Sequence, residues 1–327
     1  MNNFLRIGCG NGRGNGRGIG RCIGALLVAA VTLLQVARAD EPKLQFREIA
    51  ATDGTPLNVV ETGNPQGQPV LLLHGYSQSY LSFHEQLADP QLQARFRLVA
   101  MDLRGHGGSG KPWTSEAYAG HLPWARDLRR VIETLGLDRP VIVGWSFGGF
   151  VAMDYVREYG PQAVTALVLT GSHGGLLPRP AGTPPRYVGD LDGAIRGARE
   201  FMRVMSAKPV SQEAVDRGTY TNVMMPAYVR NAMPGKRLDN TDMLPTLAVP
   251  TLVILGDRDG SLPAEAVRKS LAVNPRIETL ILPGVGHSAF LEDPATFDRE
   301  LLRVATAARA NAAGTAAAVS AQPSAPP

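Results

Sequence analysis

A serine between two glycines is the residue of this 327-residue chain best suited to chemistry. Ser146 stands at the centre of Gly144-Trp145-Ser146-Phe147-Gly148, after an apolar run and before a stretch with helical spacing. A serine on a sharp strand-to-helix turn needs small residues two positions away on either side, and glycine supplies them. The hydroxyl then projects above the sheet edge, beside the N–H groups of the helix N-terminus. The pattern predicts a nucleophile at Ser146.

A base and a carboxylate that could activate this serine follow later in the chain. A serine hydroxyl is a poor nucleophile near neutral pH and needs a histidine oriented by an acidic group. His287 ends a glycine-rich loop that follows the last expected strand, and Asp257 and Asp259 both follow the strand before it. The order serine, aspartate, histidine is a known arrangement of a catalytic triad. Either aspartate could orient His287 on this reasoning alone.

Three other kinds of chemistry fit the sequence less well. The run from Gly105 to Lys111 looks like a phosphate-binding loop, but Pro112 replaces the hydroxyl that binds magnesium and no helix opens there. No histidine pattern of a metal site is present, and His84 and His121 are expected on helix surfaces. Both cysteines, Cys9 and Cys22, lie in the first 39 residues. We therefore expect no metal, no cofactor and no cysteine catalysis.

The elements that must position these residues alternate along the chain. Apolar runs covered on both faces are typical of a parallel sheet between helices. We expect an opening hairpin and six further strands, over residues 44–49 and 57–61, then 70–73, 97–101, 141–143, 166–169, 252–255 and 279–282. Helical spacing is found over 120–135, 148–159, 263–271 and 294–308. The fold class is therefore α/β, with a mostly parallel central sheet flanked by helices.

The alternation breaks once, over about residues 172–247, where prolines are frequent and no strand-like run occurs. This stretch predicts a helical cap inserted at the carboxyl edge of the sheet. Six of the nine methionines and several aromatic residues lie in it: Met202, Met205, Met224, Met225, Met233 and Met243, with Phe201, Tyr187, Tyr220 and Tyr228. They could line a pliable apolar pocket or simply pack a small helical cap.

Five motifs in this order resemble the α/β-hydrolase superfamily, in its serine-nucleophile group with a helical cap. They are His74-Gly75-Tyr76, the run Asp102 to Ser109, the run Gly144 to Gly149, Gly256-x-x-Asp259-x-x-x-Pro263, and Gly286-His287. Together they span about residues 44–305. The resemblance implies the α/β-hydrolase fold for residues 40–309.

The resemblance also implies roles for individual residues. It implies a catalytic triad of Ser146, Asp259 and His287, and an oxyanion hole formed by the backbone N–H groups of Tyr76 and Phe147. Asp259 is preferred over Asp257 because it has the family's spacing to the flanking glycine and proline. The run after Asp102 is then a structural turn.

The serine narrows the reaction. Haloalkane dehalogenases and epoxide hydrolases of this superfamily use an aspartate at the same turn, which Ser146 excludes. We expect hydrolysis of a small to medium carboxylic ester through an acyl-enzyme, because the cap roofs the site and charges interrupt its apolar residues, as over 196–203. A perhydrolase or haloperoxidase-like protein, a lactonase, a C–C hydrolase and an aminopeptidase share the triad. A non-catalytic binding protein is the alternative of another class.

The basic excess of the chain lies in its first 39 residues. They hold five of the 33 basic residues and no acidic residue, which leaves 28 basic against 29 acidic residues in the rest. The remainder therefore lacks the basic footprint of a nucleic-acid-binding protein. We expect a small-molecule substrate and no nucleic-acid partner, with the oligomeric state open.

The same N-terminal segment predicts export. An uncharged run over residues 23–36 precedes Ala37-Arg38-Ala39, which fits a signal-peptide cleavage site. The run is shorter than the roughly 20 residues that span a membrane. We predict a signal peptide over 1–39, a mature chain from Asp40 without a membrane span, and a periplasmic or secreted protein; an uncleaved anchor is the alternative. Residues 310–327, rich in alanine and proline, predict a disordered tail.

Overall fold

The computed structural model describes residues 43–178 and 189–320. The predicted signal peptide, the start at Asp40, the prolines at 180, 184 and 185 and the last seven residues lie outside this range.

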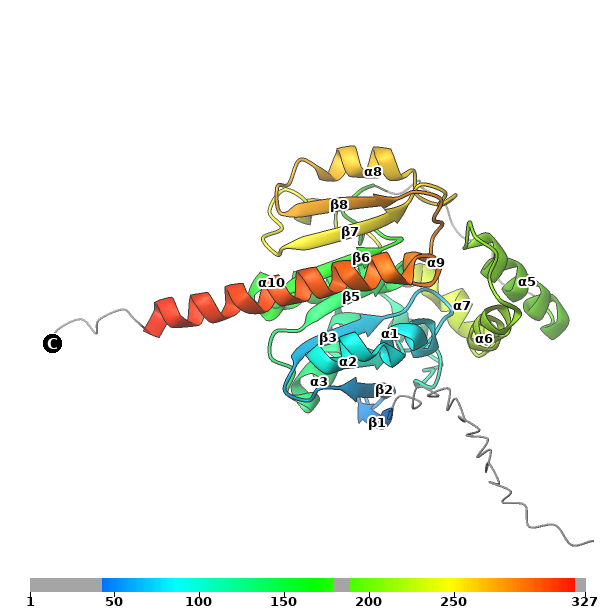
Figure 1. Cartoon of the computed structure of the whole chain (residues 1–327). Coiled ribbons are helices and arrows are strands. Elements are labelled where there is room, and N and C mark those ends of the chain that lie inside the picture. The colour runs from blue at the N-terminus through cyan, green and yellow to red at the C-terminus, as the bar shows by residue number, and fades with distance from the viewer. Residues whose placement is uncertain (1–42, 179–188, 321–327) are drawn as a thin grey trace, which may run out of the picture. The chain divides into compact units, whose positions relative to one another are not determined.

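One eight-stranded sheet forms the centre of the described chain, as Figure 1 shows. Its order is β1-β2-β4-β3-β5-β6-β7-β8. The strands are β1 (Gln45–Ala50), β2 (Pro56–Gly63), β3 (Gln68–Leu73), β4 (Phe96–Met101), β5 (Val141–Trp145), β6 (Ala166–Thr170), β7 (Thr251–Gly256) and β8 (Ile277–Leu282). β1 pairs antiparallel with β2 and β2 with β4, whereas all other neighbours are parallel. The predicted fold class is confirmed.

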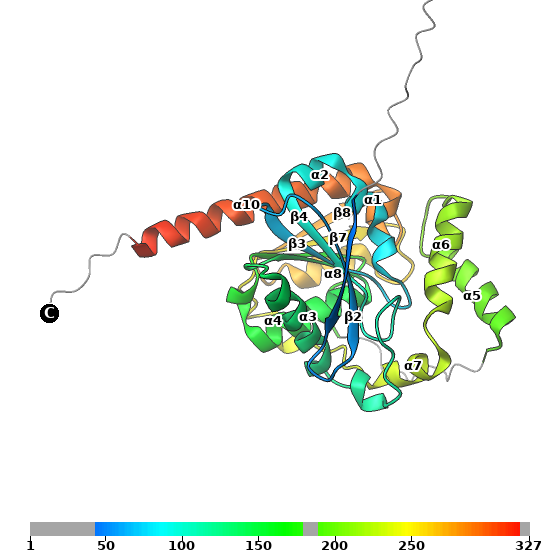
Figure 2. The ribbon, with the colours of Figure 1, turned by 90° about the horizontal axis from the view of Figure 1, so that it is seen from below.

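Helices cover both faces of the sheet, and each face has its own apolar core. On one face pack α3 (Leu122–Leu135), α4 (Phe147–Tyr159) and α8 (Ala264–Leu271), with Trp124, Val151 and Val267 in the core. On the other pack α1 (His84–Ala88), α2 (Pro90–Arg95), α9 (Ala289–Glu292) and α10 (Pro294–Ser320), with Leu87 and Phe297 in the core. Figure 2 shows the two layers on opposite sides of the strands. The continuous apolar runs follow from this double coverage.

Short helical elements that the apolar pattern does not predict connect the strands. α2 begins where the Asp89 carboxylate accepts a hydrogen bond from Leu92 N–H and Pro90 occupies the first turn, a common helix start. Other short elements are 3-10 turns, namely η1 (Tyr80–Phe83), η2 (Ser115–Tyr118), η3 (Pro161–Ala163), η4 (Met233–Gly235) and η5 (Thr241–Met243).

The described part of the inserted segment forms three helices beyond the carboxyl ends of the strands (Figure 2). They are α5 (Leu191–Val204), α6 (Gln212–Val223) and α7 (Ala227–Ala232). Asp190 and Ser211 cap α5 and α6 by accepting hydrogen bonds from backbone N–H groups in the first turn. We refer to these three helices as the cap.

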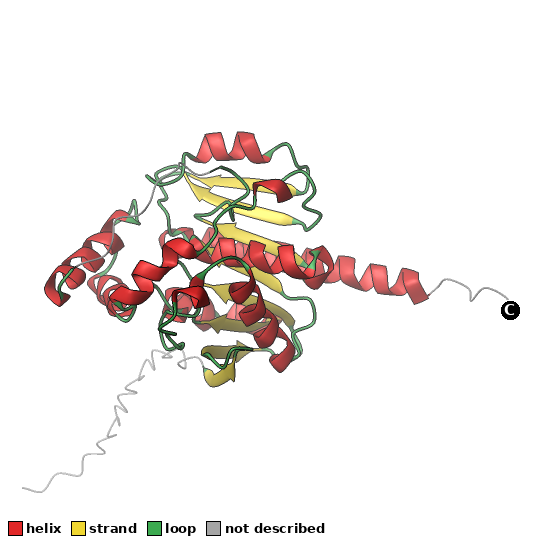
Figure 3. Cartoon of the chain, turned by 180° about the vertical axis from the view of Figure 1, so that it is seen from behind, coloured by secondary structure: helices red, strands yellow, loops and turns green. Residues whose placement is uncertain are grey.

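The C-terminal helix differs from the prediction. α10 continues to Ser320, although the sequence predicted helix only to residue 308 and a disordered tail from residue 310. Alanine dominates this segment and has the highest helix propensity of all residues, which the reading of low complexity overlooked. The last turns of α10 extend past the strands in Figure 3.

Candidate active site

Ser146 lies on the turn between β5 and α4, in a strained conformation. Its φ of 51° and ψ of −113° are rarely adopted by residues with a side chain. Its N–H donates to the Thr170 carbonyl at 2.9 Å, which fixes the turn against β6. A Cβ at Gly144 would approach the Gly149 Cα within 2.6 Å, and one at Gly148 would collide with the Leu73 carbonyl. The glycines are therefore required by close backbone packing around the serine.

His287 and Asp259 form a buried pair at the ends of β8 and β7. His287 Nδ1 lies 2.7 Å from Asp259 Oδ2, and the two side chains are 8% and 1% exposed. Because an ionised carboxylate only accepts hydrogen bonds, Nδ1 carries the proton and Nε2 is the basic nitrogen of the neutral ring. The imidazole is thus held in the tautomer that a general base requires.

Ser261 contacts both members of this pair, and the sequence analysis did not predict it as a site residue. Its hydroxyl donates to Asp259 Oδ1 at 2.6 Å and its backbone N–H donates to the same oxygen at 2.8 Å. The hydroxyl oxygen also lies 3.2 Å from His287 Nδ1. Burial raises the pKa of Asp259, but the hydrogen bonds from His287 and Ser261 outweigh it, and the pKa is lowered overall. A serine two residues after an aspartate is a common local turn, and this was the available signal.

Asp257, the other carboxylate considered from the sequence, lies elsewhere. Its Oδ1 accepts a hydrogen bond from Gly284 N–H at 2.7 Å, in the loop after β8. The structure therefore brings Asp259, and not Asp257, to His287.

The two predicted oxyanion donors follow β5 and β3 and lie near Ser146. Phe147 is the first residue of α4, where backbone N–H groups have no partner within the helix. Tyr76 follows β3 and, with Ser146 and His287, lines one cavity of about 610 Å³. Their rings pack edge to face, 6.4 Å apart. The structure thus gathers the five predicted site residues around one place.

This cavity is largely apolar and is closed on one side by the cap. Its polar lining residues include Ser172, His173, Ser261 and Ser270, and its apolar ones include Phe150, Phe201, Met205, Leu262 and Val267. Phe201 and Met205 therefore line the cavity, while Met225 and Met233 are buried in the core and Tyr220 and Met224 are exposed. Both roles considered for the methionines occur. Tyr187 lies outside the described residues.

The loop that carries His287 is joined to the segment between α5 and α6 through Glu292. The Glu292 carboxylate accepts hydrogen bonds from Gly286 N–H at 3.0 Å and from Ala207 N–H at 2.7 Å. The His287 N–H itself donates to the Met205 carbonyl at 3.0 Å. The histidine loop and the α5–α6 connection are therefore held together.

The glycine-rich run after β4 is a structural turn. Gly105 and Gly107 have positive φ, and a Cβ at Gly107 would collide with the Asp102 carboxylate. His74 accepts from Leu103 N–H at 3.0 Å, and burial lowers its pKa to about 4, so it is neutral. Among the described residues, no group of three or more histidine, cysteine or acidic side chains is placed to hold a metal ion.

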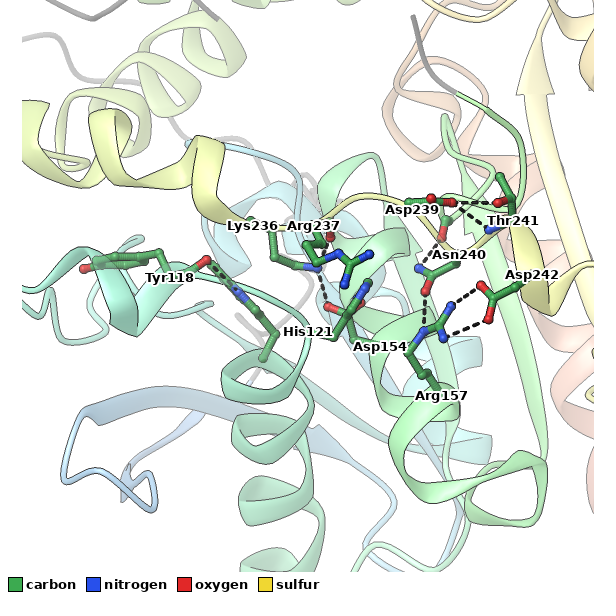
Figure 4. Close-up of polar contacts among 12 residues, drawn as sticks. Tyr118, His121, Asp154, Arg157, Lys236, Arg237, Asp239, Asn240, Thr241 and Asp242 are labelled. Carbon is green, nitrogen blue, oxygen red and sulfur yellow. Dashed lines mark hydrogen bonds and ion pairs between the residues drawn. The ribbon is translucent and has the colours of Figure 1, made fainter. Parts of the chain in front are cut away.

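A second histidine–aspartate pair lies away from the cavity, and Figure 4 shows it. His121, at the start of α3, contacts Asp154 of α4 through Nδ1, so it is not the plain surface group that the sequence predicted. Asp154 Oδ2 also pairs with Lys236 Nζ at 2.5 Å, and both side chains are fully buried. Arg157 pairs with Asp242 and Asn240 nearby. We call these six residues the α4 ionic cluster.

Comparison with known proteins gives relatives named as hydrolases and peroxidases. A model of the alpha/beta hydrolase family matches residues 70–300. The AB hydrolase superfamily protein YisY of Bacillus subtilis is 27% identical over 240 residues, covering 69% of this chain and 87% of that protein. The non-heme haloperoxidase of Rhodococcus erythropolis is 26% identical over 276 residues, covering 78% and 97%.

A solved structure is similar over nearly its whole length. The esterase RhEst1 from Rhodococcus sp. ECU1013 has a TM-score of 0.69 and 30% identity, covering 80% of this chain and 98% of that chain.

In the part of the chain described, no helix combines the length and apolar character needed to cross a membrane.

Proposed function

The chain belongs to the alpha/beta hydrolase family, and we propose that it is a serine hydrolase of small to medium carboxylic esters. The observation that carries this proposal is that His287, which lines the same cavity as Ser146, is paired with the buried Asp259. A serine, a tautomer-fixed histidine and adjacent backbone donors are the parts that acyl transfer needs.

In the proposed reaction, Ser146 Oγ attacks the ester carbonyl carbon while His287 Nε2 takes the hydroxyl proton. The carbonyl oxygen becomes an oxyanion, which the N–H groups of Tyr76 and Phe147 stabilise. His287 then gives the proton to the leaving alcohol, and an acyl-enzyme remains. Water then gives a proton to the same nitrogen and attacks the acyl carbon; the bond from this carbon to Ser146 Oγ breaks, His287 returns the proton to Oγ, and the carboxylic acid leaves.

The cavity supports the preference for small to medium acyl chains. Its volume of about 610 Å³ lies within the range of 300–1,000 Å³ common for small-molecule pockets. Each methylene contributes only about 1–3 kcal/mol to discrimination, so we expect a graded optimum. The test is kcat/KM for p-nitrophenyl esters from acetate to palmitate, with Ser146→Ala as the matched inactive control. Activity that rises steadily to palmitate would instead identify a lipase.

A haloperoxidase-like activity is the second candidate, because the Rhodococcus erythropolis relative is named a non-heme haloperoxidase and 97% of it is covered by this chain. A carboxylic acid would acylate Ser146 with loss of one water, and hydrogen peroxide in place of water would then attack the acyl-enzyme and release a peracid and free Ser146. Adding peroxide and acetate to the same assay separates the two activities. Peracid formation without ester turnover would favour this candidate.

We also propose that the protein is exported after cleavage before Asp40. The Ala-x-Ala triplet supports this. N-terminal sequencing of the exported protein should then begin at Asp40, and an exported chain that still begins at Met1 would contradict the cleavage and favour the uncleaved anchor.

A further inference from the structure

We propose that Asn222 and Arg230 of the cap are positioning residues for the oxyanion hole. The proposal rests on the proposed function, because it concerns the turn that carries Tyr76. We call residues 75–78 the oxyanion turn. If it is correct, the cap does more than enclose the substrate: it fixes the backbone that stabilises the transition state.

The oxyanion turn contains a residue in an unfavourable conformation. Gln78 N–H donates to the Gly75 carbonyl at 3.2 Å, which closes a four-residue turn with Tyr76 and Ser77 at its centre. Ser77 has a φ of 55° at the third position, where glycine is preferred because it has no Cβ. A serine persists in this conformation only where its surroundings hold it there.

Asn222, near the end of α6, makes that contact. Its Nδ2 donates to Ser77 Oγ at 2.7 Å, across 145 residues of sequence, and both residues are buried. The neighbouring Thr221 hydroxyl donates to Gln78 Oε1 at 3.1 Å. Two consecutive residues of the cap therefore contact two consecutive residues of the oxyanion turn.

Arg230, on α7, orients the asparagine. Its Nη2 donates to Asn222 Oδ1 at 2.8 Å and to the Asn222 backbone carbonyl. Because guanidinium groups only donate, this contact assigns the amide oxygen to Arg230 and the amide nitrogen to Ser77. The same guanidinium lies 6.0 Å from the centre of the Tyr76 ring. Arg230 thus contacts both Tyr76 and the residue that holds Ser77.

The consequence concerns the transition state more than substrate binding. An oxyanion donor acts only if it lies at hydrogen-bond distance from the position of the developing oxyanion. Without the Asn222 contact, Ser77 can relax from its positive φ and move the Tyr76 N–H. None of Ser77, Asn222 and Arg230 is among the residues that line the cavity. We therefore expect kcat to change and KM to stay nearly constant.

The test compares Asn222→Ala with the wild type on a short p-nitrophenyl ester. We expect kcat to fall about tenfold to a hundredfold, with KM within about twofold. Binding of an alkyl trifluoromethyl ketone should weaken by a similar factor. Ser146 Oγ adds to the carbonyl carbon of this inhibitor while His287 takes the hydroxyl proton, and the carbonyl oxygen becomes an oxyanion in the hole. Asn240→Ala is the matched control, since Asn240 is a buried asparagine at the other end of the inserted segment. It should lower the melting temperature and leave kcat and KM nearly unchanged.

A rescue experiment distinguishes positioning from simple packing. Glycine adopts positive φ without penalty, so Ser77→Gly combined with Asn222→Ala should recover most of the lost kcat. A rise in KM with unchanged ketone affinity, or no recovery in the double variant, would overturn the proposal. If Asn222→Ala does not fold, Arg230→Lys, which keeps the cation but loses the planar donor pair, should lower kcat and ketone affinity together. Ester turnover by Ser146→Ala would refute the proposed function itself, independently of these results.

Discussion

Two histidine–aspartate pairs of this chain make the same contact, from Nδ1 to a carboxylate oxygen, but have different surroundings. In each pair the histidine Nδ1 contacts an aspartate carboxylate, His287 with Asp259 and His121 with Asp154. The His287 pair lies at the carboxyl edge of the sheet, and His287 lines the same cavity as Ser146. The His121 pair joins α3 to α4, and His121 does not line that cavity.

The second carboxylate oxygen marks the difference most clearly. Asp259 Oδ1 accepts hydrogen bonds from the backbone N–H and the hydroxyl of Ser261. Both donors are neutral, so the negative charge of the Asp259 carboxylate is not cancelled and acts on His287. Asp154 Oδ2 pairs with the buried Lys236 ammonium, which neutralises that charge. Burial lowers the pKa of Lys236, and the Asp154 carboxylate opposes this shift. A histidine–aspartate contact alone therefore does not indicate catalysis, since the two pairs differ in the group on the other carboxylate oxygen and in whether the histidine lines the cavity.

Removing the two histidines should separate the pairs by the largest factor. We expect His287→Ala to lower kcat for a short ester by about 10⁴-fold or more, because the base is lost. His121→Ala should keep kcat within about twofold and lower the melting temperature. Steady-state kinetics and thermal unfolding of both variants give the comparison. Comparable losses of kcat in the two folded variants would contradict the distinction.

Replacing the carboxylates by amides is the next largest test. Asp259→Asn allows the wrong histidine tautomer and should cost about 10⁴-fold in kcat. Asp257→Asn is the matched control in the same loop and should be nearly neutral. If Asp257→Asn proved inactive and Asp259→Asn stayed active, the assignment of the orienting carboxylate would be reversed.

Asp154→Asn should affect stability instead of turnover. It leaves the buried Lys236 ammonium without its counter-charge, and breaking a buried ion pair in this way costs about 3–5 kcal/mol. Urea unfolding measures the change in the free energy of unfolding, and kcat measured well below the transition should stay near the wild-type value. A stability equal to that of the wild type would show that the α4 ionic cluster does not stabilise the fold.

Among the changes to the His287 pair, Ser261→Ala should lower kcat the least, by about tenfold or less, because one hydrogen bond is lost. The pKa of Asp259 is below its ordinary value of 3.8, so its ionised form stabilises the fold above that pH and the contribution disappears as the pH falls through the lowered pKa. Without the Ser261 hydroxyl the pKa rises, and inactivation by acid should begin at a higher pH. A pH profile of kcat/KM and of unfolding that matches the wild type would contradict this role.

The sequence predicts those parts of the site that depend on local pattern. The apolar runs, the glycines around Ser146 and the loop before His287 each reflect a backbone requirement within a few residues. The contacts of His121 with Asp154 and of Asn222 with Ser77 join residues 33 and 145 positions apart. No periodicity indicates such pairs, because they form only when α3 packs on α4 and when the cap closes over the oxyanion turn. The full length of α10 follows from the high helix propensity of alanine, whereas the prediction of a disordered tail considered only that the segment is rich in alanine and proline.

Labelling with an alkyl fluorophosphonate tests the central claim most directly. Peptide mapping of the wild type should find the phosphonyl group on Ser146, at one group per chain. Labelling should be absent in Ser146→Ala, strongly slowed in His287→Ala and unchanged in His121→Ala. A label on another residue, or labelling of His287→Ala at the wild-type rate, would contradict the account that the His287–Asp259 pair activates Ser146.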